Sequence, residues 1–168
     1  MSIFHKSVYT ADYAVFTDPG NRPVNEDSIG FSETPSLTGF FLCDGLGGHG
    51  MGDAASQCAV KTFKEVLQKE TDALQCLKSG FEEAQQAVLS EQLRLKADQK
   101  MKTTAVMLLL DAARLYIGHI GDSRVYLRRI RSCFRQKITV FRKSSLKSVR
   151  SHRIRSGIIR KEVCFLRS

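Results

Sequence analysis

The alternation of hydrophobic and polar positions divides the first three quarters of the chain into strands, two helices and further strands. Short apolar or β-branched runs predict six strands, at 11–17, 27–31, 38–43, 103–110, 115–120 and 123–127. Two longer segments, 51–69 and 72–97, repeat apolar residues at three- and four-residue spacing, which predicts amphipathic helices. The turn Gly121-Asp122 predicts that the last two strands form a hairpin.

Each predicted helix has one apolar face. In the first helix the face is formed by Ala55, Ala59, Phe63, Val66 and Leu67. In the second it is formed by Leu74, Leu77, Phe81, Ala84, Val88 and Leu95. The apolar face of the second helix is suited to packing on the domain's own sheet. The alternative is that it binds a partner helix in a coiled coil. Strands followed by two helices and more strands predict an α+β domain with helices on a largely antiparallel sheet.

The charge is distributed unevenly along the 168 residues. Residues 1–127 contain 12 Lys/Arg and 16 Asp/Glu, whereas residues 128–168 contain 14 Lys/Arg and the single acid Glu162. The net charge of +9 therefore arises from a basic tail on a mildly acidic domain. We predict a domain at 1–127 and an irregular basic tail at 128–168, because no periodicity is clear in the tail.

The composition narrows the class of protein. No apolar stretch is long enough to cross a membrane, and residues 1–10 lack the apolar core of a secretory signal. Five cysteines, Cys43, Cys58, Cys76, Cys133 and Cys164, contain no CxxC pair, so neither a zinc site nor a disulfide framework is indicated. We expect a cytoplasmic protein, with the nucleus as the alternative.

The most informative segment is FLCDGLGGHG, residues 41–50. An apolar strand ends in Asp44, and a glycine-rich turn begins directly at Gly45. A carboxylate held at the end of a strand is the kind of oxygen ligand that a hard divalent cation prefers. Upstream, Arg22 supplies a planar, permanently charged fork suited to a phosphate dianion. The structural alternatives are a cap or turn role for Asp44 and a solvated turn position for Arg22.

Four segments together resemble the metal-dependent protein phosphatases (the PPM, or type 2C, family). They are GNRPVNEDS at 20–28, DGLGGH at 44–49, KTTAV at 102–106 and GHIGDSRVYL at 118–127. They follow the family's order and spacing, with Lys102 where the family usually has glycine. The resemblance covers about residues 8–127, the N-terminal half of a family domain. It implies an incomplete form of the family's α/β/β/α sandwich, with unpaired strand edges.

The resemblance also implies an activity and a set of site residues. The activity is hydrolysis of phosphoserine and phosphothreonine in a phosphoprotein substrate by water activated by two Mn²⁺ or Mg²⁺ ions. Arg22 would bind phosphate, Asp44 and the Gly45 carbonyl would bind the metal pair, and Asp122 a third metal. Glu26 and Asp27 would hold metal-bound waters, although ordinary surface roles remain open for these acids and for Asp122. The proposed general-acid histidine of the family is replaced by Leu46, and the role is not transferred to His49.

The chain departs from the family after Asp122, because no later aspartate occurs. The family completes its metal site with two downstream aspartates, so we expect a truncated site with weak or no activity alone. The abrupt loss of acids at Arg128 motivates the hypothesis that residues from about 128 derive from a shifted reading frame or an alternative exon. The other two frames of the encoding DNA would test it.

Two functions other than catalysis remain open. One is a catalytically dead fragment that binds a phosphoprotein or a regulatory partner. The other is nonspecific binding of polyanions by the basic tail, since its positive charges attract them in a salt-dependent way. No specific nucleic-acid recognition is expected, because residues 128–168 contain three aromatic residues and no recognisable motif.

Overall fold

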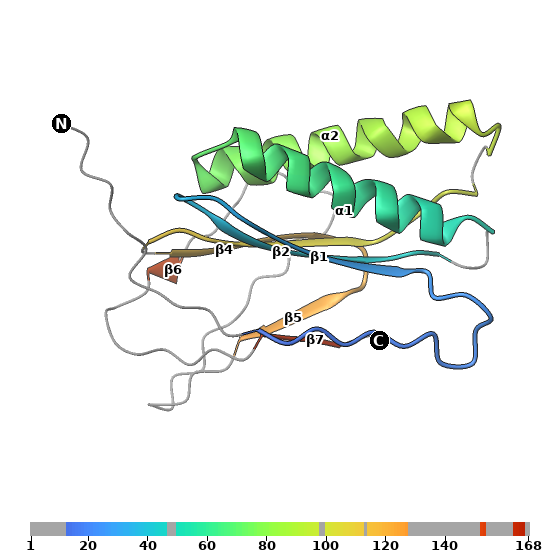
Figure 1. Ribbon diagram of the computed structural model, residues 1–168, viewed down its shortest axis with the longest axis horizontal. Coiled ribbons are helices and arrows are strands. Elements are labelled where there is room, and N and C mark those ends of the chain that lie inside the picture. The colour runs from blue at the N-terminus through green and yellow to red at the C-terminus, as the bar shows by residue number, and fades with distance from the viewer. Residues whose placement is uncertain are drawn as a thin grey trace.

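The computed structural model describes residues 13–46, 50–97, 100–112 and 114–127, and the backbone of two short strands at 152–153 and 163–166. The described elements form layers (Figure 1). Two helices cover one face of an antiparallel sheet, and a second, smaller pair of strands lies on the opposite side. The α+β class predicted from the sequence is confirmed.

The larger sheet has the strand order β1-β2-β3-β4-β6. Its strands are β1 (Asp27–Glu33), β2 (Thr38–Asp44), β3 (Ala105–Leu110), β4 (Arg114–Ile120) and β6 (His152–Arg153). All neighbouring pairs are antiparallel. The smaller sheet pairs β5 (Arg124–Leu127) with β7 (Val163–Leu166). The predicted strands at 27–31, 38–43, 103–110 and 115–120 are confirmed, with shifts of one to two residues at their ends.

The two helices are α1 (Gly52–Lys69) and α2 (Ala73–Arg94). The short link between them ends at Asp72, whose carboxylate accepts a hydrogen bond of 2.8 Å from the Gln75 amide and caps α2. All five residues predicted for the inner face of the first helix are buried. Four of them, all except Ala55, pack with Phe41, Cys43, Met107 and Leu109 of the sheet, so the main core lies between helices and sheet. Ala55 packs with Val88, Ala97 and Met101 in a smaller cluster.

The opposite face of the sheet is also apolar. Phe40, Val106, Leu108 and Leu115 form a second buried cluster there, and Val125 of β5 joins it. Tyr13 stacks on Phe31 at a centroid distance of 4.5 Å and extends this cluster. An apolar face on both sides is typical of a sheet that lies inside a sandwich.

Three predictions of secondary structure were wrong. Residues 13–17, the described part of the predicted strand at 11–17, form no strand, and Val15 and Phe16 are exposed. Their apolar character does not produce a strand because no neighbouring strand pairs with them among the described residues. The predicted hairpin at 115–127 is also absent, since β5 pairs with β7 and not with β4. Gly121, at a φ of 104°, turns the chain out of the first sheet.

The third correction concerns the basic tail, for which no regular structure was expected. β6 and β7 lie in it, and each completes the edge of a strand from the first 127 residues. An unpaired edge presents free N–H and C=O groups that favour such pairing. The boundary at 127 and the origin of the tail stay predictions. None of the helices among the described residues has the length and apolar composition needed to cross a membrane.

Candidate functional site

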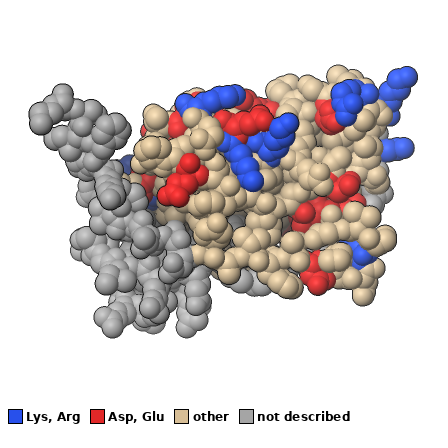
Figure 2. Space-filling model, viewed as in Figure 1, with Lys and Arg blue, Asp and Glu red and all other residues tan. Residues whose placement is uncertain are grey.

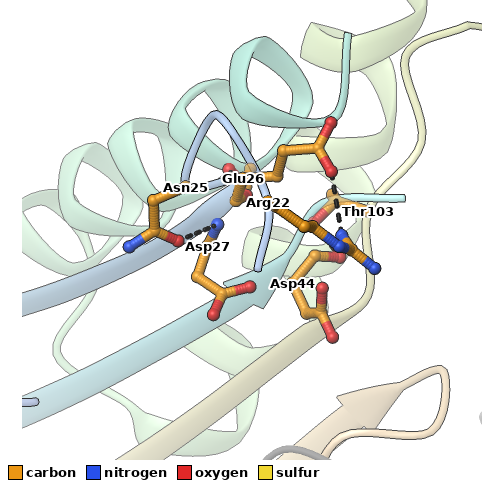
Figure 3. A network of polar contacts seen from close by, with 7 residues as sticks. Arg22, Asn25, Glu26, Asp27, Asp44 and Thr103 are labelled. Atoms are coloured by element: carbon orange, nitrogen blue, oxygen red, sulfur yellow. Dashed lines mark hydrogen bonds and ion pairs between the residues drawn. The ribbon is translucent and has the colours of Figure 1, made fainter. Parts of the chain in front are cut away.

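The candidate site lies where β1 begins and β2 ends. Asp27 and Asp44 are partners in the antiparallel register of these strands. Because side chains alternate along a strand, both point to the face opposite the helices, the face that carries Phe31 and Phe40. Figure 3 shows the two carboxylates turned to the same side. The fold therefore brings together two of the acids that the sequence singled out.

The backbone of Asp44 is held by the two threonines that precede β3. Its carbonyl oxygen accepts hydrogen bonds from the Thr104 amide (2.8 Å) and the Thr103 hydroxyl (3.0 Å). Its amide donates to the Thr104 hydroxyl at 3.1 Å. The side chain of Asp44 thus projects from a fixed point, which is what a metal ligand needs if its geometry is to be set in advance.

Gly45 lies against the start of α1 without space for a side chain. A Cβ on Gly45 would lie 2.3 Å from the Gly52 carbonyl oxygen and 2.6 Å from that of Glu26. The Gly45 amide donates to the Glu26 carbonyl at 3.1 Å, and no described residue donates to the Gly45 carbonyl. That carbonyl is consistent with the predicted metal-ligand role, which stays a prediction.

Arg22 reaches the site from the loop before β1. Its guanidinium pairs with the Glu26 carboxylate at 2.9 Å, and the two side chains are 45% and 12% exposed. The loop is a tight turn in which the Arg22 amide donates to the Pro19 carbonyl. Figure 3 places Glu26 on the opposite side from the Asp27 carboxylate. Glu26 therefore orients Arg22 in this structure, while the Asp27 side chain shares the face of Asp44.

Polar contacts also anchor the β1 end of the site to α1. The Ser56 hydroxyl lies 2.7 Å from the Glu26 carbonyl and 2.9 Å from the Ser28 hydroxyl. Ser56 itself is fully buried. Ser56 thus joins the beginning of α1 to the first residues of β1 through hydrogen bonds.

Asp122 lies on the other side of β3 from Asp44 and is exposed. Its neighbour Ser123 is buried and shares a hydrogen bond of 2.7 Å with Thr104, the residue that binds the Asp44 backbone. This connection places Asp122 at the same end of the sheet. Its role at a third metal remains a prediction, and His49 lies outside the described residues.

The described acids do not fit a complete two-metal centre. No group of three His, Cys, Asp or Glu residues close enough to hold an ion occurs within the part of the chain that the structure describes. Two adjacent divalent ions need several anionic oxygens to offset their mutual repulsion. The described residues therefore supply too few carboxylates for such a centre.

Sequence reasoning did not find every residue that builds the site. Thr103 and Thr104 belong to the KTTAV segment, but no role was predicted for either. No role was predicted for Gly52 or Ser56. Two adjacent threonines before an apolar strand were the available signal. Their contact with Asp44 depends on the β2–β3 register, which the sequence did not provide.

His119 is a further feature without a predicted role. It is 7% exposed and lies beside Val106 in the β3–β4 register. Neither ring nitrogen has a hydrogen-bond partner among the residues that the structure describes. Burial lowers the pKa of the imidazole, and the negative charge of Asp122 opposes that effect. The neutral form is therefore favoured at neutral pH.

Comparisons with known proteins agree on one family. A sequence profile described as Protein phosphatase 2C matches residues 20–139, past the domain boundary predicted at 127. The chain is 35% identical over 121 residues to the serine/threonine protein phosphatase PstP of Mycobacterium tuberculosis, covering 70% of this chain and 23% of PstP. It is 34% identical to the serine/threonine phosphatase stp of Listeria welshimeri, covering 66% of this chain and 47% of that protein.

Solved structures give the same result. The phosphatase Stp1 of Staphylococcus aureus superposes with a TM-score of 0.62 at 26% identity, over 74% of this chain and 54% of Stp1. The catalytic domain of PstP, solved with two manganese ions, superposes with a TM-score of 0.55 at 30% identity, over 72% of this chain and 50% of that domain. The chain thus spans about half the length of these structures.

Proposed function

The chain belongs to the protein phosphatase 2C family, and from that membership we propose that it acts on phosphoserine and phosphothreonine in proteins through a metal-dependent site. The observation that carries the proposal is the cluster at the end of β1 and β2. There Asp27 and Asp44 share one face, and Glu26, the residue before Asp27, pairs with Arg22.

The proposed roles follow from the chemistry of each group. Arg22 binds a phosphate dianion through its planar fork, and it is half-exposed, so it can exchange Glu26 for phosphate. Asp44 and the Gly45 carbonyl offer hard oxygen ligands to Mn²⁺ or Mg²⁺. Asp27 accepts hydrogen bonds from metal-bound water on the same face.

Because the described ligands are incomplete, we propose that the chain alone binds phosphoprotein more readily than it hydrolyses it. Full activity then requires carboxylates beyond the described acids. The second candidate function is capture of a phosphoprotein without turnover. It is favoured by the same observation, that no group of three His, Cys, Asp or Glu residues occurs among the described residues.

One experiment separates these outcomes. Phosphopeptide binding and Mn²⁺-dependent release of phosphate are measured for the chain, for Arg22→Ala and for Asp44→Ala. We expect phosphate-dependent binding that Arg22→Ala weakens, with little release of phosphate in any of the three. Rapid turnover that Asp44→Ala abolishes would refute the incomplete site and establish the phosphatase. Binding that is indifferent to phosphate would refute both candidates.

A further inference from the structure

A groove runs along the outer edge of the larger sheet, between β1 and α1. It has a volume of about 380 Å³ and is lined by Ser28 and Ile29 of β1 and by residues of α1 between 57 and 65. β1 is the terminal strand of the sheet, and its one described neighbour is β2. The Asp27 amide already donates to the Asn25 side chain and the Glu33 carbonyl accepts a hydrogen bond from Gln68. The outer N–H and C=O groups between these two positions can pair with an added extended peptide.

The wall of this groove formed by α1 carries two lysines, Lys61 and Lys64. Lys61 is 4.0 Å from Glu65 in an exposed pair, which contributes little because water screens it. Lys64 has no carboxylate partner among the described residues. Figure 2, which views this face, shows basic side chains extending from the helix layer over the sheet. The groove thus offers a positive charge beside an open strand edge.

The position of Lys64 along β1 is fixed by Gly30. A Cβ at Gly30 would lie 2.9 Å from the Lys64 Cε. The end of the lysine side chain therefore lies next to the space that a side chain at position 30 would fill. With a rise of about 3.3 Å per residue, Gly30 is roughly 10 Å along β1 from Asp27. Lys64 is therefore within a few residues of the candidate site.

The groove leads along β1 toward the end of the strand at which the candidate site lies. α1 and β1 run in the same direction away from the site, since Ser56 contacts Ser28 near their start and Gln68 contacts Ser32 near their end. A chain that pairs with β1 would therefore approach the end of the strand from which the loop with Arg22 leads.

We propose that this groove binds an acidic segment of the phosphoprotein substrate as an added strand on β1. An acidic side chain about three to four residues from the phosphorylated residue would lie against Lys64. The proposal rests on the proposed function for the identity of the partner. The edge of β1 supplies main-chain hydrogen bonds, and Lys64 supplies selectivity for acidic peptides.

The test uses fluorescein-labelled phosphoserine peptides and fluorescence anisotropy with the full chain. Two peptides carry glutamates at the third and fourth positions, either before or after the phosphoserine, because both strand directions are open. Matched peptides carry alanines there. We expect one glutamate peptide to bind about fivefold more tightly than its alanine counterpart, the upper range for an exposed ion pair.

Lys64→Glu should remove this gain, and a peptide with lysines at the same positions should then bind the variant more tightly than the glutamate peptide does. Lys78→Glu, an exposed position of α2 outside the groove, is the matched control and should keep the gain. N-methylation of alternate peptide amides should weaken binding at those that pair with β1. Equal affinity for glutamate and alanine peptides, or equal loss in both variants, would overturn the proposal.

Unphosphorylated versions of the peptides separate this proposal from the one on which it rests. If phosphate adds nothing but the glutamate gain still depends on Lys64, the proposed function fails and the groove remains an acidic-peptide site. If phosphate adds affinity through Arg22 but Lys64→Glu changes nothing, the groove proposal fails and the proposed function stands.

Discussion

Asp27 and Asp44 lie directly opposite each other at the end of the β1–β2 pair, with both side chains on the face away from the helices. Like charges directly opposite in an antiparallel pair repel and destabilise the sheet. A bound cation would relieve that repulsion. We therefore expect the metal-free chain to gain stability when one of the two charges is removed.

This relationship predicts that Asp27→Asn stabilises the chain when metals are removed. In EDTA at low salt, the free energy of unfolding should rise by about 0.2–1 kcal/mol, because one of two facing charges is lost. The increase should shrink at 1 M salt, where exposed charges are screened. Urea denaturation followed by circular dichroism measures both values.

Glu33→Gln is the matched control for this prediction. Glu33 lies at the far end of the same strand, where its register partner is the uncharged Thr38. It should change stability little in either salt condition. A loss of stability in Asp27→Asn would show that the two carboxylates do not repel each other in the folded chain.

The contact between Gly45 and Gly52 leads to a second prediction. Gly45→Ala places a Cβ 2.3 Å from the Gly52 carbonyl oxygen, and the nearest atoms are all backbone. Backbone cannot move aside as a side chain can, so we expect a loss of about 1–3 kcal/mol, as for overpacked cores. Thermal unfolding would detect it as a clear decrease in Tm.

Gly20→Ala is the comparison for this glycine. Gly20 has a φ of 61° but open space around it, so alanine there meets only backbone strain, worth about 1–2 kcal/mol. Gly45→Ala should additionally shift the amide signals of Gly52 and Leu46 in an NMR spectrum, which Gly20→Ala should leave in place. Unchanged signals would mean that the strand and helix are less closely packed than described.

The sequence predicted the elements of the main core well because their periodicity reflects burial. Ala55, Ala59 and Phe63 recur at helical spacing and are all buried in α1. The strand predicted at 38–43 is an uninterrupted apolar run, and both of its faces are indeed apolar. The local sequence pattern was sufficient to predict an element where burial of its residues follows the period of a single helix or strand.

The sequence failed where the outcome depended on distant partners. The Gly121-Asp122 turn has hairpin chemistry, but β5 pairs with β7, about forty residues later in the chain. Val15 and Phe16 have strand propensity and no partner strand among the described residues. Arg22, Asp27 and Asp44 were identified from their motifs, yet their arrangement required the β1–β2 register.

Cysteine reactivity gives a third prediction. Burial raises the pKa of the Cys43 thiol well above its usual range, and that of Cys76 to about 11, whereas Cys58 is partly exposed. At pH 8, iodoacetamide should therefore modify Cys58 before Cys43 or Cys76, since only the thiolate reacts. Peptide mapping by mass spectrometry resolves each position. In 6 M urea the three rates should converge, and faster modification of Cys43 in the folded chain would contradict its burial.

The last prediction concerns His119, which is buried and whose ring nitrogens have no hydrogen-bond partner within the described part of the chain. His119→Leu loses no hydrogen bond and removes a desolvation cost, so the free energy of unfolding at pH 7.5 should rise by about 1 kcal/mol. Burial also lowers the pKa of His119 in the folded state, so between that pKa and about 6.5 the unfolded chain binds more protons. Wild-type stability should therefore fall as the pH drops below about 6.5.

The stability of His119→Leu should fall less than that of the wild type over the same pH range. Urea titrations of both proteins at pH 7.5 and 5.5 measure the difference. His119→Gln separates polarity from protonation, because glutamine keeps a buried polar group but does not titrate. The stability of His119→Gln should depend on pH as weakly as that of His119→Leu. At pH 7.5, however, its free energy of unfolding should not rise above that of the wild type, because the buried polar group remains. A wild-type chain that is more stable than His119→Leu at both pH values would mean that the imidazole has a stabilising partner in solution.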